Sequence, residues 1–261
     1  MTMSAILPDY IQGEKFVSLY NYDGVYYRAT HEVNTFFDDP PDWPFVLISH
    51  NSDGKITDTP GKFDADVNLM PDNLIKWYGQ NVDVVNDKIE SIPIGLENSK
   101  WFPRLRKREK MLRKTEEEKR IKNLVYMNHN IRTNPIERGR IYDRLSDKSW
   151  VTTSMGKNGK LFDEYLDNVY NHKFVLSPSG NGIDTHRTWE CLYMGTIPIE
   201  RRNLNNQFFS DLPICFVDDW EELTYDFLEE EYERISNMKW DTNKLKFNYW
   251  KEKVICTKQR H

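Results

Sequence analysis

One segment of the chain, residues 174–199, combines glycines with charged side chains at spacings that suit an anionic ligand. It opens as an apolar strand that ends at Ser177. Gly180 and Gly182 then allow the backbone to turn and a ligand to approach closely. The residues that follow predict a helix from about Thr185 to Met194.

The start of this predicted helix carries the charges. Asp184 can cap the helix, Arg187 lies in its first turn, and Glu190 follows three residues later on the same face. A helix N-terminus beside an arginine binds anions such as a diphosphate, and a glutamate one turn further can accept hydrogen bonds from ribose hydroxyls. The pattern predicts a nucleotide-diphosphate site at the carboxyl end of a parallel sheet. A plain glycine turn with a surface Arg–Glu pair would use the same residues, and neither G-x-G-x-x-G nor G-K-[ST] is present.

Several motifs together resemble those of one enzyme family. The run Ser179-Gly-Asn-Gly-Ile-Asp-Thr-His-Arg-Thr-Trp-Glu190, with Gly195-Thr-Ile-Pro-Ile199, resembles the donor-binding signature of exostosin-like glycosyltransferases of GT-B type. Further matches are Gly79-Gln-Asn-Val82, Ile94-Gly-Leu-Glu-Asn98 and Asn128-His-Asn130 with Arg138. The resemblance spans about residues 45–200. It is strongest to small members encoded by large algal viruses, one of which is similar to a xylosyltransferase that adds xylose to fucose in a capsid glycan.

This resemblance implies an α/β fold with two Rossmann-like lobes, a cleft between them and a compact N-terminal lobe. The C-terminal lobe would bind the nucleotide sugar, with Arg187 on the diphosphate and Glu190 on the ribose. The other donor-binding residues that it implies are Gly180, Asn181, Gly182, Asp184, His186, Asn130 and Arg132. UDP-xylose is the expected donor, with a fucosyl- or other hexosyltransferase as the alternative. The donor is a substrate, and we expect no cofactor.

Enzymes of this family are generally inverting, so the resemblance implies one displacement and a base in the N-terminal half. Asp53 is the candidate base because it follows an apolar strand over residues 44–50, where α/β sites lie. Asn-Ser-Asp-Gly is also an ordinary turn. His50 is an alternative base, and Asp72 and Glu97 are further ones.

Aromatic side chains in the N-terminal half could stack on the acceptor sugar. Trp77 and Tyr78, with His50, are the predicted acceptor contacts, and Trp43 and Trp101 are similar candidates. Each of these rings could equally belong to the core.

Two other classes of protein stay open. Asp64-Ala-Asp66 matches the D-x-D of metal-dependent GT-A transferases, although chance alone produces such pairs in a chain rich in aspartate. The histidines lack paired ligand spacing, so we predict no metal site. A non-catalytic protein that binds a nucleotide sugar or a glycan would keep Arg187 and Glu190 and tolerate loss of Asp53.

The elements that must position these residues alternate along the chain. Strands are predicted over residues 44–50, 91–95, 124–128, 173–177, 196–199 and 213–217, with a possible hairpin over 16–29. Helices are predicted over 71–78, after Asn134 and Pro135, over 185–194, from Asp218 or Asp219 to about Ser236, and over 244–255. Alternation of this kind favours a largely parallel sheet. The predicted domains are an acceptor-binding lobe (1–103), a charged linker helix (104–122), a donor-binding lobe (123–240) and a helix returning to the first lobe (241–261).

Composition limits the remaining possibilities. The chain has 261 residues, and 36 Lys and Arg against 41 Asp and Glu give a net charge of −5, which disfavours nucleic-acid binding. The three cysteines are widely spaced, which disfavours a disulfide framework. No signal peptide or membrane span is evident. We therefore expect a cytoplasmic protein (host cytoplasm if viral) that is a monomer or a weak dimer and whose partners are a nucleotide sugar and a glycan.

Overall fold

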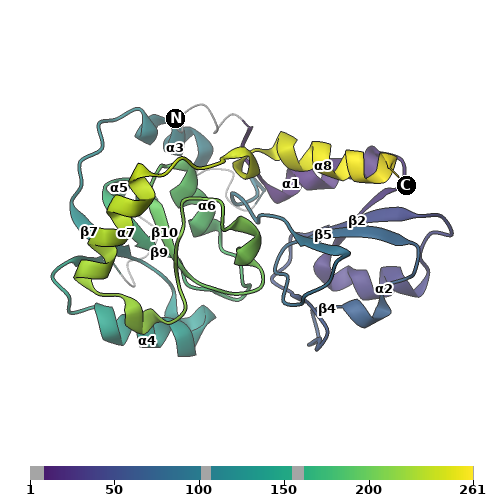
Figure 1. Cartoon of the computed structure of the whole chain (residues 1–261), viewed down its shortest axis with the longest axis horizontal. Coiled ribbons are helices and arrows are strands. Elements are labelled where there is room, and N and C mark those ends of the chain that lie inside the picture. The colour runs from purple at the N-terminus through teal and green to yellow at the C-terminus, as the bar shows by residue number, and fades with distance from the viewer. Residues whose placement is uncertain (1–8, 101–106, 155–161, 261) are drawn as a thin grey trace.

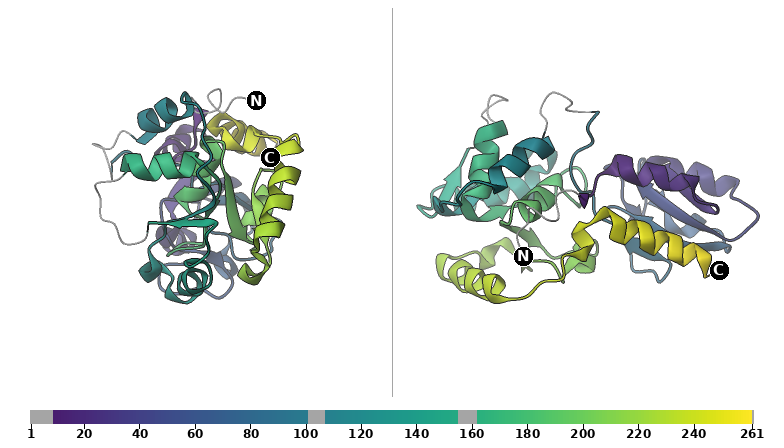
Figure 2. Two further views of the ribbon diagram at one scale, coloured as in Figure 1. Left: turned by 90° about the vertical axis from the view of Figure 1, so that its left-hand side faces the viewer. Right: turned by 90° about the horizontal axis from the view of Figure 1, so that it is seen from above.

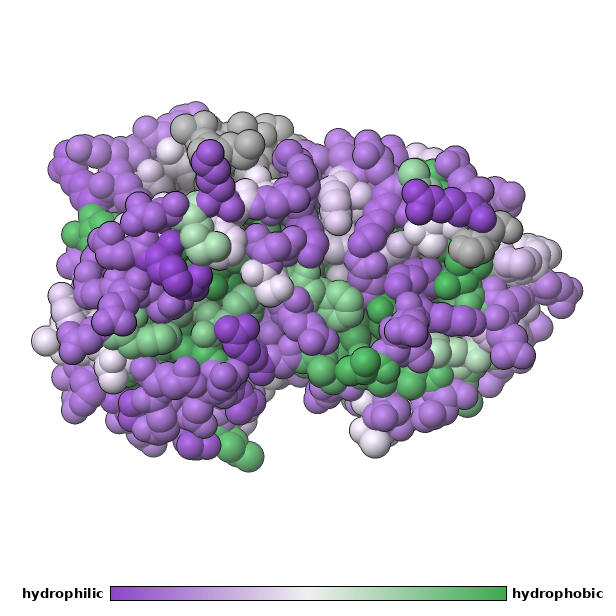
Figure 3. Space-filling model, viewed as in Figure 1, coloured by the Kyte–Doolittle hydropathy of each residue, from purple (hydrophilic) through white to green (hydrophobic). Residues whose placement is uncertain are grey.

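Two parallel β-sheets organise the chain, each in its own unit of the molecule (Figure 1). The structure is a computed structural model that describes residues 9–100, 107–154 and 162–260. The α/β class and the parallel pairing predicted from the alternating elements are confirmed. No helix among the described residues is both long and apolar enough to cross a bilayer. The face drawn in Figure 3 is mostly hydrophilic, with a notch between the two units at its lower edge.

The first sheet has the order β1-β2-β5-β6, and all of its pairings are parallel. Its strands are β1 (Val25–Ala29), β2 (Phe45–His50), β5 (Leu74–Gly79) and β6 (Ile89–Ser91). Helix α2 (Val33–Asp38) covers one face, and α1 (Gly13–Val17) and α8 (Phe247–Gln259) cover the other (Figures 1 and 2). Successive residues of β2 alternate between the two apolar clusters, as the pleat of a strand requires. A small parallel pair, β3 (Ile56–Thr57) and β4 (Ala65–Asp66), lies beside this sheet.

The second sheet has the order β11-β10-β9-β7-β8 and is also parallel. Its strands are β7 (Asn123–Met127), β8 (Val151–Thr153), β9 (His172–Leu176), β10 (Ile197–Arg201) and β11 (Cys215–Val217). Its helices are α3 (Lys107–Thr115), α4 (Pro135–Leu145), α5 (Phe162–Tyr170), α6 (His186–Tyr193) and α7 (Tyr225–Asn237). Short 3-10 helices occupy Ser18–Asn21, Thr30–Glu32, Val67–Leu69, Ile131–Thr133, Asn206–Phe209, Trp220–Glu222 and Asn243–Leu245.

Some of the local capping predictions in the second unit are confirmed. Asn134 caps α4 with Pro135 at its first turn, and Gly195 has the positive φ of a residue that ends a helix. Asp219 caps only the 3-10 helix Trp220–Glu222, and Thr224 caps α7.

Three predictions for the first unit were wrong. Residues 71–78 form no helix; they lead into strand β5, whose residues pair with β2. Residues 16–29 form no hairpin, because only Val25–Ala29 is a strand and the residues before it form α1 and a 3-10 helix. The strand predicted at 91–95 ends at Ser91.

One apolar cluster runs between the two sheets. It joins Ile48 of β2 to Val175 of β9, with Trp189 of α6 and Trp250 of α8 in the same contact network. Tyr193 adds two hydrogen bonds: its hydroxyl accepts from the Ile11 N–H at 2.8 Å and donates to the Leu245 carbonyl at 2.7 Å. The two units are therefore held to each other by packing as well as by the chain that connects them.

Candidate functional site

The carboxyl ends of strands from both sheets meet where the two units face each other. The turn after β2 approaches the glycine turn after β9, since Asn181 Nδ2 donates to Asp53 Oδ2 at 3.3 Å. Asp184 joins the start of α6 to the first unit: its N–H donates to Asn81 Oδ1 at 2.9 Å, and its Oδ2 accepts from the Ile94 N–H at 2.8 Å. This is the edge where ligands of open α/β sheets bind.

The two glycines of the turn are needed because protein side chains come close to them. A Cβ atom on Gly180 would lie 2.9 Å from Arg138 Nη2, and one on Gly182 would lie 2.9 Å from Asn81 Nδ2. Neither glycine is among the residues with positive φ. The sequence suggested that they ease the turn of the chain and the approach of a ligand, whereas the structure shows them making room for Arg138 and Asn81.

Arg138 of α4 fixes the shape of this turn. Its guanidinium donates to the carbonyls of Pro178 (2.9 Å), Ser179 (2.8 Å) and Asn130 (3.0 Å). Burial, with the nearby charge of Arg187, lowers the pKa of Arg138 to about 10. The carbonyls satisfy its hydrogen bonds, but no carboxylate among the described residues forms an ion pair with it.

Arg187 brings a second positive charge to the same place. It is the second residue of α6, and its Nε is buried without a hydrogen-bond partner. Within the described ranges no ion pair with a carboxylate involves Arg187. Its charge adds to burial in lowering the pKa of His129 to about 4. Two guanidinium groups without an acidic partner, at a helix N-terminus, form a site that favours an anion.

Glu190 does not pair with Arg187. It is buried, accepts a hydrogen bond from the Tyr165 hydroxyl at 2.5 Å, and lies 3.3 Å from Lys107 Nζ. Lys107 also lies 4.0 Å from Glu97 of the first unit. Both Glu190 oxygens therefore have protein partners, and its contact with a ribose stays a prediction.

Asp184 and His186 link the two units. Asp184 does not cap α6, contrary to the prediction, because Thr185 occupies the cap position. Instead Asp184 also accepts from the Trp189 indole N–H, and burial together with the charge of Glu200 raises the pKa of Asp184 to about 7. His186 Nδ1 donates to the Gly95 carbonyl at 2.7 Å, and Nε2 lies 3.5 Å from a Glu97 oxygen.

Glu200 behind this contact offers a test of the local electrostatics. Burial raises the pKa of Glu200 from 4.5 to about 7, although the Thr188 hydroxyl and Asn206 donate to its carboxylate. Between these pH values the folded chain keeps a proton that the unfolded chain releases, so rising pH costs stability. In Glu200→Gln the amide oxygen can accept from Asn206 while the amide N–H donates to Thr188.

We therefore expect Glu200→Gln to gain stability relative to wild type as pH rises from about 5 to about 8. Urea unfolding at each pH measures this difference. A difference between the two proteins that stays constant over the range would contradict the raised pKa.

A cavity of about 280 Å³ opens beside the contact between the units. Asp53 and Glu97, two of the three carboxylates considered as a base, line it together with His186, whereas Asp72 does not. The wall also carries the side-chain amides of Asn51, Gln80 and Asn98, together with Ser52 and Lys100. Amides and carboxylates around a small cavity suit a ligand rich in hydroxyl groups.

Hydrogen bonds hold these amides in place. Asn51 has a φ of 59°, its Nδ2 donates to the Tyr27 hydroxyl at 2.6 Å, and its Oδ1 accepts from Asn98 Nδ2 at 2.8 Å. Gln80 Oε1 accepts from the Asn51 N–H at 2.9 Å. Asn81 donates to the Ser52 carbonyl at 3.2 Å on one side and accepts from Asp184 on the other. The amide groups are thus oriented before any ligand binds.

Three of the residues predicted to contact the acceptor lie away from the cavity. Trp77 is fully buried and donates to Ser49 Oγ at 2.8 Å, and Tyr78 is buried with its hydroxyl 2.8 Å from Thr257 Oγ1. His50 is also buried: its Nε2 lies 3.0 Å from the Pro93 carbonyl, and its Nδ1 accepts from the Asn51 N–H. Burial lowers the pKa of His50 to about 4. These side chains support the core and the turn, and none of them lines the cavity, so their contact with an acceptor stays a prediction.

The remaining predicted residues lie at the surface or outside the described ranges. Asp53 is exposed on the cavity wall, and Asn130 and Arg132 are exposed in the turn after β7, where Asn130 Oδ1 accepts from the Arg132 N–H at 3.1 Å. Trp43 is 54% exposed. Trp101 lies outside the described residues.

The Asp64-Ala-Asp66 pair has local structural partners. Asp64 accepts from the Lys55 N–H at 2.7 Å and from the Gly61 N–H at 2.9 Å, and Asp66 caps a 3-10 helix through the Asn68 N–H. Across the described residues no group of three or more His, Cys, Asp or Glu side chains could hold a metal ion. The arrangement gives the D-x-D pair a role in shaping a loop.

The sequence placed Gln80, Asn81, Asn98 and Arg138 in motifs that carry the family resemblance but assigned no role to them, and it did not single out Asn51. Asn51 follows β2, Gln80 and Asn81 follow β5, and each of these strands is strongly apolar. Polar residues directly after buried parallel strands were the available signal. The role of Arg138 could not be predicted from the sequence, because its contacts arise only when the fold brings α4 beside the glycine turn.

Comparison with known proteins gives little beyond this geometry. No family model matches the chain, and no curated protein matches it. Among solved structures it is similar to that of AviGT4, a glycosyltransferase involved in avilamycin A biosynthesis, with a TM-score of 0.39 and 12% sequence identity. The alignment covers 88% of this chain and 77% of that one.

Proposed function

We propose that this chain is a glycosyltransferase that binds a nucleotide sugar on the second unit and a glycan acceptor in the cavity beside Asp53. The observation that carries the proposal is the buried, unpartnered Nε of Arg187 at the start of α6, next to Arg138. Arg187 is part-buried, and a part-buried positive charge without an acidic partner favours a ligand that supplies the negative charge. The diphosphate of a nucleotide sugar is such a ligand. In the proposed complex the glycine turn, which Arg138 holds in place, would lie beside the diphosphate.

The acceptor side follows from the amide-lined cavity. A sugar hydroxyl that enters it meets Asp53 on the wall, and Asn181 of the glycine turn contacts the same carboxylate. The reacting groups of both substrates can therefore meet between the units, which supports a GT-B-like arrangement of two lobes around the site.

The proposed reaction is a single displacement with inversion. The acceptor oxygen attacks the anomeric carbon, its proton passes to the Asp53 carboxylate, and the bond from the anomeric carbon to the phosphate oxygen breaks. The nucleoside diphosphate leaves with the bonding electrons, and the Arg187 guanidinium stabilises the charge that develops on it. Glu190 and His186 complete the donor side, and no step uses Asp64 or Asp66.

The identity of the substrates rests on the resemblance of the sequence motifs to exostosin-like glycosyltransferases. On that basis UDP-xylose is the proposed donor and fucose within a glycan the proposed acceptor. The contacts described above favour a diphosphate and a hydroxyl-rich acceptor, and they carry no preference among sugars.

Calorimetry with UDP-xylose, UDP-glucose and GDP-fucose in EDTA tests the proposal. We expect saturable binding of at least one donor, with UDP competing for the same site. A donor that binds only when Mn²⁺ is added would favour a metal-dependent transferase instead. Failure of every donor and of UDP under both conditions would overturn the donor site. A donor that binds but is not transferred to any glycan would favour a non-catalytic binding protein.

A further inference from the structure

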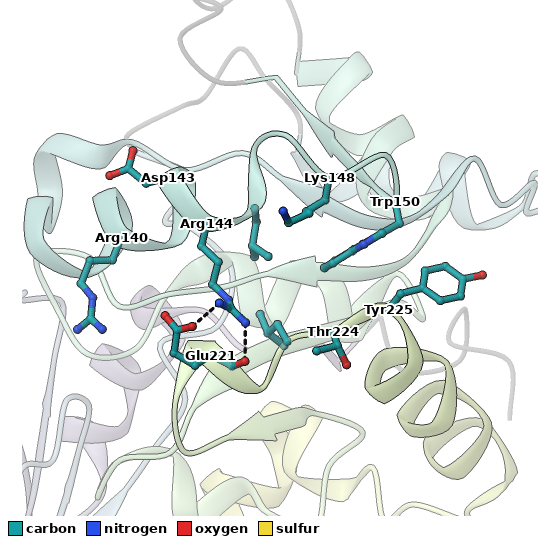
Figure 4. A pocket seen from close by; sticks show the side chains of 10 residues that line it. Arg140, Asp143, Arg144, Lys148, Trp150, Glu221, Thr224 and Tyr225 are labelled. Carbon is teal, nitrogen blue, oxygen red and sulfur yellow. Dashed lines mark hydrogen bonds and ion pairs between the residues drawn. The ribbon is translucent and has the colours of Figure 1, made fainter.

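A second cavity lies on the second unit, between α4 and the start of α7 (Figure 4). It has a volume of about 680 Å³, within the range of small-molecule sites, and shares no lining residue with the cavity beside Asp53. Its wall includes Trp150, Tyr225, the Arg144–Glu221 pair, Arg140 and Asp143. None of these residues has a part in the proposed reaction.

Trp150 stands apart from the other packed tryptophans. Among the described residues, an indole N–H donates to a protein oxygen in each of Trp77, Trp189, Trp220, Trp240 and Trp250. Trp150 is part-buried against the apolar cluster below the cavity, yet no residue in the described part of the chain accepts from its N–H. Figure 4 shows its ring reaching into the cavity toward Arg144. A part-buried indole ordinarily finds such a partner, so this N–H is available to a ligand.

The opposite wall carries a paired arginine. Arg144 of α4 donates through Nη2 to the Glu221 carbonyl at 2.5 Å, and its Nη1 forms an ion pair with the Glu221 carboxylate. Figure 4 shows this pair below Lys148 and across from Trp150. The fixed pair gives the cavity one wall that ligand binding need not order.

The charges on the wall nearly cancel. The lining includes Arg140, Arg144 and Lys148 as well as Asp143 and Glu221, and Lys148 Nζ also lies 3.0 Å from Asp147. Arg140 and Asp143 are both exposed, and neither forms an ion pair within the described residues. They leave one free donor and one free acceptor at the rim. A phosphate would meet two carboxylates here, whereas an uncharged ligand with many hydroxyls would find both kinds of partner.

We propose that this cavity binds a neutral oligosaccharide, separately from the transfer site. One face of a sugar ring would stack on Trp150, whose N–H would donate to a hydroxyl or ring oxygen, and neighbouring hydroxyls would bond Arg140 and Asp143. Tyr225, which is 49% exposed at the rim, offers a second aromatic ring on which the next sugar of the oligosaccharide would stack. The inference does not depend on the transferase activity, because it uses no residue of that site.

Saturation-transfer NMR on the full chain tests it, with xylohexaose, mannohexaose and cellohexaose as probes at millimolar concentration. We expect saturable transfer to at least one probe and an affinity at least about tenfold lower in Trp150→Ala. Tyr20→Ala is the control, because Tyr20 is an exposed aromatic residue outside this cavity and outside the cavity beside Asp53, and it should bind as wild type does. Arg140→Ala removes an exposed side chain with no structural partner and should also weaken binding. Because this variant should fold normally, it tests the site even if Trp150→Ala misfolds.

Two outcomes would overturn the proposal. One is the absence of saturable transfer to all three probes, or transfer unchanged in both Trp150→Ala and Arg140→Ala. The other is a Trp150-dependent site that takes UDP and none of the sugars, which would make the cavity an anion site.

Discussion

Replacing Arg187 with alanine is expected to lower kcat/KM for the nucleotide sugar by about 10²–10³-fold and to weaken UDP binding in parallel. The guanidinium is the unpaired charge at the start of α6, and it would stabilise the diphosphate both in the bound donor and as it leaves. Because Arg187 Nε has no hydrogen-bond partner in the protein, the substitution by alanine breaks no hydrogen bond made by that atom. Thermal stability should therefore stay close to wild type.

Arg113→Ala is the matched control for this experiment. Arg113 is exposed on α3, so its loss removes the same charge without touching the site. Calorimetry with UDP and initial-rate measurements on both variants separate the local effect from the change in net charge. Equal UDP affinity in wild type and Arg187→Ala would remove this arginine from the donor site and, with it, the main support for a transferase.

Asp53→Asn is the second variant with a large expected effect, a fall in kcat of about 10²–10⁴-fold with donor affinity close to wild type. Asparagine keeps the size of the side chain, and its oxygen can still accept from Asn181 Nδ2, so the turn should keep its position. What it loses is the capacity to take the proton of the attacking hydroxyl. Single-turnover transfer and donor calorimetry on the same preparation measure the two quantities separately.

Glu97→Gln distinguishes the two carboxylates of the cavity. Glu97 lies near His186 and Lys107 and is expected to position neighbouring groups, so its loss should change KM more than kcat. Full activity in Asp53→Asn combined with loss of transfer in Glu97→Gln would move the base to Glu97.

The fold of the second unit was largely predictable because its signals are local. Asn134 followed by Pro135, the apolar run before Ser177 and the glycine at 195 each act within a few residues. The segment ending in Tyr78 was misassigned because Leu74, Trp77 and Tyr78 fit one side of a helix as well as a strand. Pairing of that segment between β2 and β6, which no pattern within the segment reports, decided the outcome.

The candidate site was predictable only in its outline. Arg187 and Asp53 could be placed because each follows a strand that the sequence makes evident. The partners of those residues could not, since Asn81 meets Asp184 across 103 positions and Lys107 meets Glu190 across 83. The acceptor contacts could not be predicted for a related reason. The sequence around Trp77 and Tyr78 does not show that helices and neighbouring strands will bury both rings.

Helix α8 reverses the order in which the two halves can finish folding during synthesis. Trp250 and Val254 complete the apolar cluster over Val46 and Ile48 of the first sheet, although they follow the whole second sheet in sequence. When every strand of the second unit has left the ribosome, helix α8, which covers one face of the first sheet, has therefore still not been synthesised. The half made first keeps an open hydrophobic face until the last helix emerges, and during that interval it is the half that chaperones would hold.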